Sequence, residues 1–254
     1  MAEEKFPYTC VKPARLLYSS VTQPSAPKGM ENVEPKYSGT FGIEKEDLDA
    51  IVKLEVEAIR SATGNFTGPA DYYLAATSGE TAAKRVLKTA ELKASDPKLS
   101  ADEKAKLLER AETRAALYRQ YAGILMAGSK FEVECAKLVN GKIVDIDLST
   151  EAGKALAGKE YFYNGAYVVP RVAFQGFRAK NVDAKSGATA YLQNCLFVAK
   201  GEKLAGGGGP SNSDVFGGFS DFDPTGLEPQ AGDEFAGAAN PDAGKAGADV
   251  IDEF

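Results

Sequence analysis

Residues 159–200 combine the two kinds of side chain that bind single-stranded nucleic acid. The segment holds six basic and two acidic residues, a net charge of +4, together with eight tyrosines and phenylalanines. Aromatic rings stack on unpaired bases at about 1–3 kcal/mol per base, and lysine or arginine attracts the phosphates. The coincidence of rings and positive charge therefore favours a binding surface, although many of these rings have the alternative of packing in a core.

Residues 166–180 are predicted to form a strand with two different faces, because side chains alternate along a strand. One face carries Tyr167, Val169, Arg171, Ala173, Gln175 and Phe177, and the other carries Val168, Pro170, Val172 and Phe174. The second face is the better core face. Proline cannot donate a ladder hydrogen bond, so Pro170 predicts that this strand lies at an edge or is bulged. Residues 188–199 form the next predicted strand.

Two more predicted strands, residues 15–22 and 36–43, add cations and a ring near the start of the chain. The complete set of candidate DNA-binding residues is Arg15, Lys36, Tyr37, Tyr167, Arg171, Phe177, Arg178, Lys180 and Tyr191.

Residues 130–148 predict a β-hairpin, because Asn140-Gly141 between alternating runs is typical of a tight primed turn. The turn places Val139 opposite Lys142, and the expected core face comprises Phe131, Val133, Cys135, Val144, Ile146 and Leu148. The opposite face carries Glu132, Glu134, Asp145 and Asp147. Clustered carboxylates of this kind could hold Mg²⁺ for phosphodiester cleavage, so a metal-dependent nuclease is one alternative function. A solvated strand face explains the same spacing and is the interpretation we favour.

The last fifty residues, 205–254, have ten acidic residues and one lysine, a net charge of −9. Because the whole chain carries −6, residues 1–204 carry +3. The segment is rich in glycine, alanine and proline, which predicts a disordered tail. Phenylalanines recur beside acidic residues, so the tail could imitate single-stranded DNA. Its end, with Asp249, Asp252, Glu253 and Phe254, is the predicted partner-binding segment.

The composition argues against several other classes of function. The chain lacks histidine, the commonest general base and metal ligand, and has only three cysteines, Cys10, Cys135 and Cys195. We therefore expect no metal, no cofactor and no enzymatic activity. Widely spaced cysteines are typical of free thiols in a reducing cytoplasm. The N-terminal residues have no signal-peptide pattern, and no apolar run reaches about 18 residues, so we expect no membrane association.

Residues 44–128 are predicted to be a helical insertion within a folded domain of residues 1–204. Apolar spacing predicts a helix from Glu46 to about Ala62 that stops at Gly64, followed by helices at 79–94 and 100–122. Ser100 and Glu103 form a capping box for the last of these. A second alternative function follows, in which residues 79–122 drive the assembly of a structural or scaffold protein.

In the order of its motifs the chain resembles tailed-phage single-stranded DNA-binding proteins. The resemblance rests on Pro13–Leu17, on Glu34-Pro35-Lys36-Tyr37-Ser38, on residues 163–168 (YNGAYV), on residues 191–198 (YLQNCLFV) with Gly201, Glu202 and Leu204, and on the acidic tail ending in phenylalanine. It implies a mainly β fold, a five-stranded OB-fold barrel with the helical insertion.

The resemblance also implies a function. A protein of this kind coats and protects single-stranded DNA in phage replication, recombination and repair, in the cytoplasm of the infected bacterium, as a monomer or homodimer. Its tail competes with DNA and recruits replication proteins such as a polymerase, helicase or exonuclease. This chain departs from the pattern in a tail that is glycine-rich and less densely acidic, which puts the strength of that competition in doubt.

Overall fold

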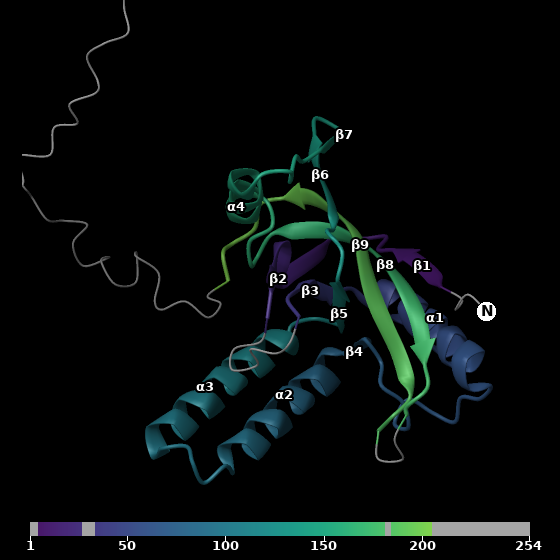
Figure 1. Cartoon of the computed structure of the whole chain (residues 1–254), viewed down its shortest axis with the longest axis vertical. Helices are drawn as coiled ribbons and strands as arrows, with labels where there is room; N and C mark the ends of the chain where they lie inside the picture. Colours follow the sequence, from purple (N-terminus) through teal and green to yellow (C-terminus); the bar gives the residue numbers. More distant parts are fainter. Residues whose placement is uncertain (1–4, 27–33, 181–183, 205–254) are drawn as a thin grey trace, which may run out of the picture. The chain divides into compact units, whose positions relative to one another are not determined.

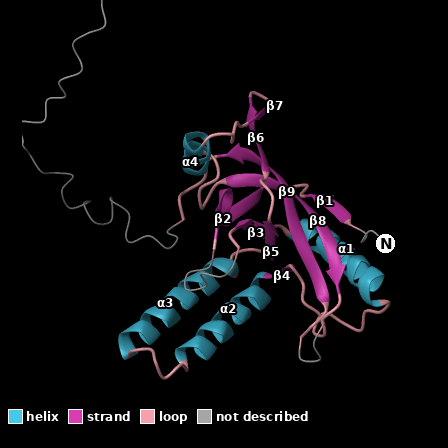
Figure 2. Cartoon of the chain, viewed as in Figure 1, coloured by secondary structure: helices cyan, strands magenta, loops and turns pink. Residues whose placement is uncertain are grey.

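The computed structural model describes residues 5–26, 34–180 and 184–204. These residues form nine strands and four helices (Figures 1 and 2). The strands are β1 (Phe6–Thr9), β2 (Ala14–Ser25), β3 (Lys36–Ile43), β4 (Ala76–Ser78), β5 (Gly123–Ser129), β6 (Glu134–Val139), β7 (Lys142–Asp145), β8 (Tyr167–Phe177) and β9 (Gly187–Ala199). The helices are α1 (Lys45–Thr63), α2 (Gly79–Ala94), α3 (Ala101–Tyr118) and α4 (Glu151–Glu160).

Five of the strands pair in a closed ring. Strand β2 pairs with β3, β3 with β5, β5 with β9, β9 with β8, and β8 returns to β2. All of these pairs are antiparallel except β5–β9. We call this ring the barrel, and together with the helices between its strands it confirms the predicted mainly β fold class with a helical insertion.

The core fills the inside of this ring. Val168, Val172 and Phe174 on β8 are fully buried, as are Leu16, Phe41 and Leu125 on neighbouring strands. Helix α1 packs against β8, where a Cβ atom on Gly176 would lie 1.9 Å from the carbonyl oxygen of Ala58. Glycine at this position therefore allows the helix to approach the strand closely, and α1 lies beside the β8–β9 pair (Figure 1).

The predicted helices of the insertion are present, although its end was placed too late. Helix α1 stops at Gly64, whose φ is 78°, and the capping box of Ser100 and Glu103 begins α3. However, α3 ends at Tyr118, and Gly123–Ser129, which we expected partly within the insertion, is strand β5 of the ring. Gly123 lies against Ile43 and Leu48, where a Cβ would have contacts of 2.9 to 3.0 Å, so it suits a packed strand.

Helices α2 and α3 lie side by side and extend away from the strands, which they contact through a second, smaller core near the start of α2 and the end of α3 (Figure 2). Leu17 and Ile124 of the ring contribute to it, together with Ala83, Ala115 and Tyr118 from the two helices. This packing fixes the helical hairpin to strands β2 and β5.

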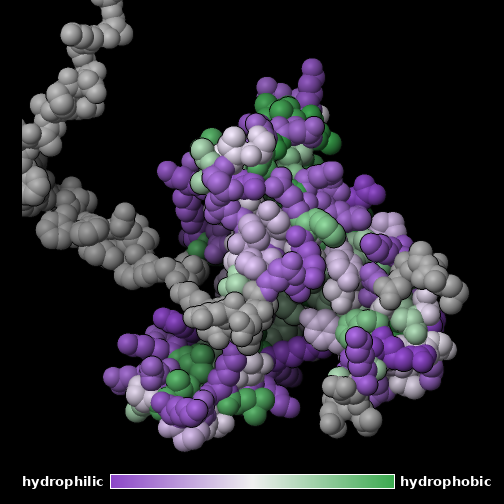
Figure 3. All heavy atoms as spheres, viewed as in Figure 1, coloured by the Kyte–Doolittle hydropathy of each residue, from purple (hydrophilic) through white to green (hydrophobic). Residues whose placement is uncertain are grey.

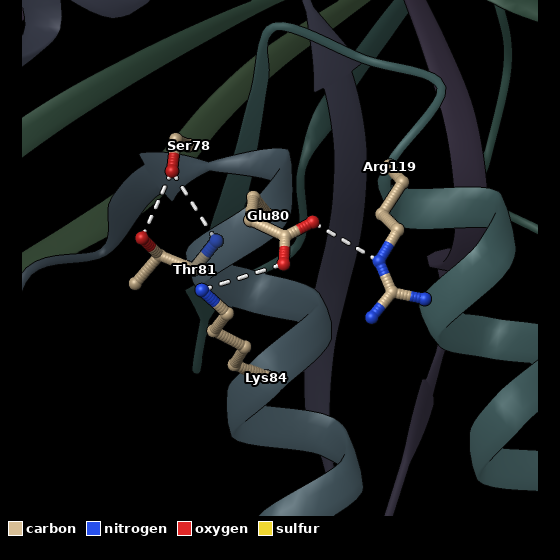
Figure 4. A network of polar contacts seen from close by, with 5 residues as sticks. All are labelled: Ser78, Glu80, Thr81, Lys84 and Arg119. Atoms are coloured by element: carbon tan, nitrogen blue, oxygen red, sulfur yellow. Dashed lines mark hydrogen bonds and ion pairs between the residues drawn. The ribbon is translucent and has the colours of Figure 1, made fainter.

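The start of α2 is tied both to its own first turn and to the end of α3 (Figure 4). The Ser78 hydroxyl accepts from the Thr81 amide at 3.2 Å, which caps the helix. Glu80 accepts from Arg119 Nε at 3.0 Å and also pairs with Lys84 at 3.5 Å. The hydrogen bond from Arg119 lowers the pKa of Glu80, as expected for a carboxylate held beside cations.

The hairpin β6–β7 has the predicted turn and register, but not all of the predicted burial. Val139 lies opposite Lys142, and Asn140 and Gly141 have φ values of 50° and 75°. Of the expected core face, Val133, Cys135 and Leu148 are buried, whereas Phe131 and Val144 are 82% and 43% exposed. Strand β6 pairs with β9 only from Glu134 to Lys137, so the tip of the hairpin extends beyond the sheet.

Besides β5, three elements were not predicted from the sequence. Residues 1–12 were expected to be irregular, yet β1 pairs with β8 along its whole length. The three-residue strand β4 pairs with β5, and helix α4 is capped by Thr150, whose hydroxyl accepts from the Gly153 amide at 3.0 Å. Each is short, and α4 contains two glycines, so hydrophobic periodicity gives little signal for them.

Candidate nucleic-acid interface

Strand β8 has the two faces that its alternation predicts. Val168, Pro170, Val172 and Phe174 are buried, whereas Tyr167, Arg171 and Phe177 are exposed on the other side. The register with β9 shifts next to Arg171, so the bulge expected near Pro170 is present. The strand is not at an edge, because β1 and β2 pair with one side of it and β9 with the other. The outward side chains of Tyr167, Arg171 and Phe177 nevertheless remain open to solvent, whereas Ala173 between them is buried.

Strand β9 adds a second row of side chains to this surface. Pairing places Tyr191 opposite Ala173 and Asn194 opposite Arg171. Lys5, immediately before β1, has its ammonium group 5.7 Å from the centre of the Tyr191 ring. We call the outward residues of β8 and β9, together with Lys5, the outer face. In its middle lies the Tyr191 ring, which is 39% exposed.

Both ends of the outer face also carry rings. At one end the Arg15 guanidinium lies 4.6 Å from the centre of the Tyr167 ring and donates to the Glu202 carbonyl at 2.7 Å. At the other end Phe177 lies 6.4 Å from Tyr73, centre to centre. Ten residues separate Tyr167 from Phe177, which corresponds to roughly 33 Å of strand. The rings are thus spread over a length that several nucleotides could occupy.

The cations that follow β8 lie near its Phe177 end. Arg178 is exposed and donates to the Thr63 carbonyl at 3.1 Å, at the C-terminus of α1, where a positive charge is favourable. Lys180 is also exposed, and Lys185 donates to the Ala70 carbonyl. These contacts hold the end of the β8–β9 pair against α1 and the segment that follows it, and keep positive charge there.

The two predicted site residues on β3 have different positions. Lys36 is exposed, whereas Tyr37 is 8% exposed and belongs to the core, so its ring is not placed to stack on a base. The two residues, which we predicted together, lie on opposite faces of one strand, so only Lys36 faces solvent.

The outer face continues from β9 across β5 to β3. Gly128 on β5 lies between Tyr191 on β9 and Ser38 on β3. Since glycine has no side chain, this strip is open, and Lys36 lies along it. Next to it Lys130 pairs with Glu34 at 2.8 Å, and this hydrogen bond raises the pKa of Lys130 and lowers that of Glu34.

Three residues that lie near the outer face were not singled out from the sequence. Lys5 approaches Tyr191 only through the pairing of β1 with β8, and Tyr73 lies in a loop whose position depends on its pairing with Gly187. Lys130 was counted only as part of the hairpin. Tail residues Asp249, Asp252, Glu253 and Phe254 lie outside the described residues.

The four carboxylates of the nuclease alternative have separate surroundings. Glu132 pairs with Lys154 at 3.2 Å, Glu134 accepts from the Asn194 side chain, and Asp147 accepts from the Ser149 amide at 2.8 Å. Asp145 is exposed on β7. Within residues 5–26, 34–180 and 184–204, no group of three or more acidic or cysteine side chains is arranged to hold a metal ion.

The three cysteines are free and buried. Burial raises the pKa of Cys10 and of Cys135 to about 12, and that of Cys195 well above its ordinary value. These thiols therefore remain protonated at neutral pH and behave as small core side chains. Every helix in the described part of the chain is too short or too polar to span a membrane.

Comparison with known proteins identifies related phage proteins. Residues 9–225 match the family model described as "Enterobacter phage Enc34, ssDNA-binding protein". The solved structure of the single-stranded DNA-binding protein from bacteriophage Enc34 is 16% identical, with 84% of this chain and 99% of that chain covered and a TM-score of 0.46. The structure of the same phage protein in complex with ssDNA is 15% identical, with 77% of this chain and 88% of that chain covered and a TM-score of 0.45.

A third similar structure is gp2.5, a single-stranded DNA-binding protein encoded by bacteriophage T7. It is 13% identical, with 89% of this chain and 100% of that chain covered and a TM-score of 0.41. No curated protein matches the chain.

Proposed function

Because this chain belongs to the family of the Enterobacter phage Enc34 ssDNA-binding protein, we propose that it binds single-stranded DNA with little sequence preference. Its role is to coat and protect DNA strands during phage replication, recombination and repair, in the cytoplasm of the infected bacterium. It acts as a binding protein and not as an enzyme. The observation that carries this proposal is the outer face, where exposed rings on two paired strands lie together with cations of β8 and of neighbouring segments.

The chemistry of the outer face accounts for tolerance of sequence. Tyr167, Tyr191 and Phe177 offer flat surfaces, and every base has a ring face that can stack on them. Lys5, Arg15 and Arg171 offer charge to phosphates, which are the same at every nucleotide. A surface of this kind gains affinity from rings and charge and gains little from reading base edges.

The acidic tail extends the proposal. Residues 205–254 carry −9, while the rest of the chain carries +3, so the tail can compete with DNA for a cationic surface. Asp249, Asp252, Glu253 and Phe254 are proposed to recruit a polymerase, helicase or exonuclease. Deleting residues 205–254 is expected to tighten binding of single-stranded DNA, and unchanged affinity would argue against competition.

A fluorescence titration with a dT oligomer at two salt concentrations tests the central proposal. Affinity should fall with salt, with a log–log slope of about −0.7 for each phosphate neutralised. Competition with a mixed-sequence oligomer should give a similar affinity. Absence of binding in dilute buffer, with residues 205–254 removed, would overturn the proposal. Incubating labelled DNA with Mg²⁺ or Mn²⁺ separates binding from cleavage, and intact DNA is expected.

A further inference from the structure

A hollow of about 1140 Å³ lies between α1, α2 and the Phe177 end of β8. Its floor includes Thr77 of β4 and Met126 of β5, and α2 forms one wall. In the space-filling view the surface is hollowed between the α2–α3 hairpin and the β8–β9 end (Figure 3). We call this hollow the cleft.

The charge of the cleft suits an anion. The described residues that line it include four cations, Lys53, Arg85, Lys88 and Lys185, and one acidic residue, Asp49. Asp49 is already paired with Lys45 at 3.0 Å, on the preceding turn of α1. The net charge of the lining therefore attracts phosphates, and the low-dielectric walls of a cleft strengthen that attraction.

The cleft also contains rings, which a simple anion would not need. Tyr72, Tyr73 and Phe177 line it, and Tyr72 is stacked on Phe66 with 5.1 Å between ring centres. Tyr73 is 43% exposed. Phe177 belongs both to the cleft and to the outer face, so the two surfaces are continuous at this ring.

The floor of the cleft offers a polar group without a partner. Thr77 is 7% exposed, and its buried hydroxyl has no hydrogen-bond partner among the described residues. Beside it, the Glu55 carboxylate accepts from the amides of Ala75 and Ala76 at 2.6 and 3.2 Å. These bonds fix the backbone of the floor, and the Glu80–Arg119 contact fixes the foot of the α2 wall (Figure 4).

We propose that the cleft binds the continuation of the single DNA strand beyond Phe177, so that the helical insertion forms part of the DNA-binding surface. The proposal rests on the function proposed above and adds a second segment to the DNA path. Bases that leave the outer face at Phe177 stack on Tyr73, while Lys53 and Lys88 on the two helices face the phosphates. Only unpaired bases can use rings inside a cleft in this way, because bases in a duplex are already stacked on each other.

The test compares two double variants with the same change in charge. Lys53→Glu/Lys88→Glu reverses two exposed cations of the cleft, and neither side chain makes a contact that the fold requires. Lys98→Glu/Lys106→Glu reverses two exposed lysines of the α2–α3 hairpin that do not line the cleft. Both are titrated, with the unmodified chain, against dT oligomers of about 8 and about 16 nucleotides, within the usual range for one OB-fold.

The cleft variant is expected to bind the longer oligomer about tenfold more weakly than the matched control, with a salt slope smaller by about 1.4 for two lost phosphate contacts. The two variants should bind the shorter oligomer alike. Equal affinity of both variants for the longer oligomer would overturn the proposal that the cleft binds DNA. Failure of the unmodified chain to bind either oligomer would overturn the proposed function instead.

Tyr73→Leu gives a second readout that does not depend on charge. The backbone amide and carbonyl of Tyr73 make its contacts with Ser186 and Ala188, so the substitution should leave the fold intact. A 16-mer containing a photoreactive pyrimidine should crosslink to the unmodified chain at Tyr73 and lose most of that crosslink in the variant. Crosslinking confined to β8 and β9 in the unmodified chain would contradict the proposal.

Discussion

The outer face and the hairpin β6–β7 are both pairs of strands with alternating side chains, yet they differ in what lies beside them. On β8 the inward row meets the barrel core and α1, so its outward row alone is exposed. On β6–β7 the pairing with β9 ends at Lys137, and side chains of both rows are exposed at the tip. Alternation therefore separates the two faces of a strand, whereas neighbouring elements decide whether either face is buried.

The two regions also differ in charge. The outer face has Lys5, Arg15 and Arg171 beside its rings, while the hairpin presents Glu132, Glu134 and Asp145 with exposed aliphatic residues. Single-stranded DNA should distinguish these surfaces, because both have exposed apolar side chains but Lys137 and Lys142 of the hairpin lie among acidic residues, whereas the cations of the outer face do not.

The largest effect should come from reversing the charge and removing the ring in the middle of the outer face. Arg171→Glu/Tyr191→Ala is expected to weaken binding of single-stranded DNA by about 100- to 1000-fold, or roughly 3–4 kcal/mol, through the loss of one stack and of phosphate attraction. The measurement is a fluorescence titration with dT oligomers in low salt.

The hairpin offers a matched control for this variant. Lys142→Glu/Ile143→Ala makes the same change in charge and shortens an exposed apolar side chain. Its affinity should stay within about twofold of the unmodified chain, because electrostatic effects on exposed sites fall off within a Debye length. Equal losses in both double variants would mean that the two regions do not differ in the way we infer.

Carboxylates show the same dependence on surroundings. Asp147 on the hairpin segment is hydrogen-bonded to Ser149, which lowers its pKa, whereas burial raises the pKa of Glu55 on α1 to about 8. For Glu55 the folded state holds the proton more tightly than the unfolded chain. Its contribution to stability is therefore complete below about pH 4.5 and is lost as the pH rises through about 8.

Glu55→Gln tests this second contrast. The amide oxygen can still accept from Ala75 and Ala76, and the variant has no charge to bury. Relative to the variant, the unmodified chain should lose on the order of 3 kcal/mol of unfolding free energy between pH 5 and pH 9. Urea unfolding at several pH values measures the difference, and parallel curves for the two proteins would contradict the raised pKa.

Much of the fold followed from local signals in the sequence. The Asn140-Gly141 turn fixed the register of the hairpin, and the capping box fixed the start of α3. The buried row of β8 was found because four consecutive alternate positions are apolar. In each case the residues within one element are sufficient to determine the local structure.

What the sequence did not reveal depends on contacts between distant segments. Tyr37 was assigned to the interface, although β5 and α4 help to enclose its side of β3, and Lys5 was missed because it approaches Tyr191 only across β8. The cleft forms where α1, α2 and β8 meet, and hydrophobic periodicity within one element cannot predict such a meeting. The sequence was thus sufficient to predict which strands carry rings and cations, whereas their arrangement in space depends on contacts between distant segments.

A smaller effect should follow from closing the strip between β9 and β3. A Cβ at Gly128 has its nearest neighbours at 3.4 and 3.9 Å, so a Cβ is accommodated there in ordinary van der Waals contact. Gly128→Leu should weaken binding of a 16-mer about fivefold if the strand crosses from Tyr191 toward Lys36, by displacing about one stacked base. Gly128→Ala serves as the control and should bind like the unmodified chain. If Leu and Ala behave alike, DNA does not use this strip.

The smallest effect concerns the hairpin itself, where Phe131 and Val133 were expected on one buried face but are 82% and 0% exposed. Phe131→Ser should change the unfolding free energy by less than about 0.5 kcal/mol, as for most surface substitutions. Val133→Thr places a hydroxyl in the core and should cost about 1–3 kcal/mol. Neither should alter DNA affinity, because neither belongs to the outer face. Urea unfolding measures both losses of unfolding free energy. Similar losses for the two substitutions would mean that Phe131 and Val133 are equally buried. Neighbouring elements would then not explain the difference between this hairpin and β8.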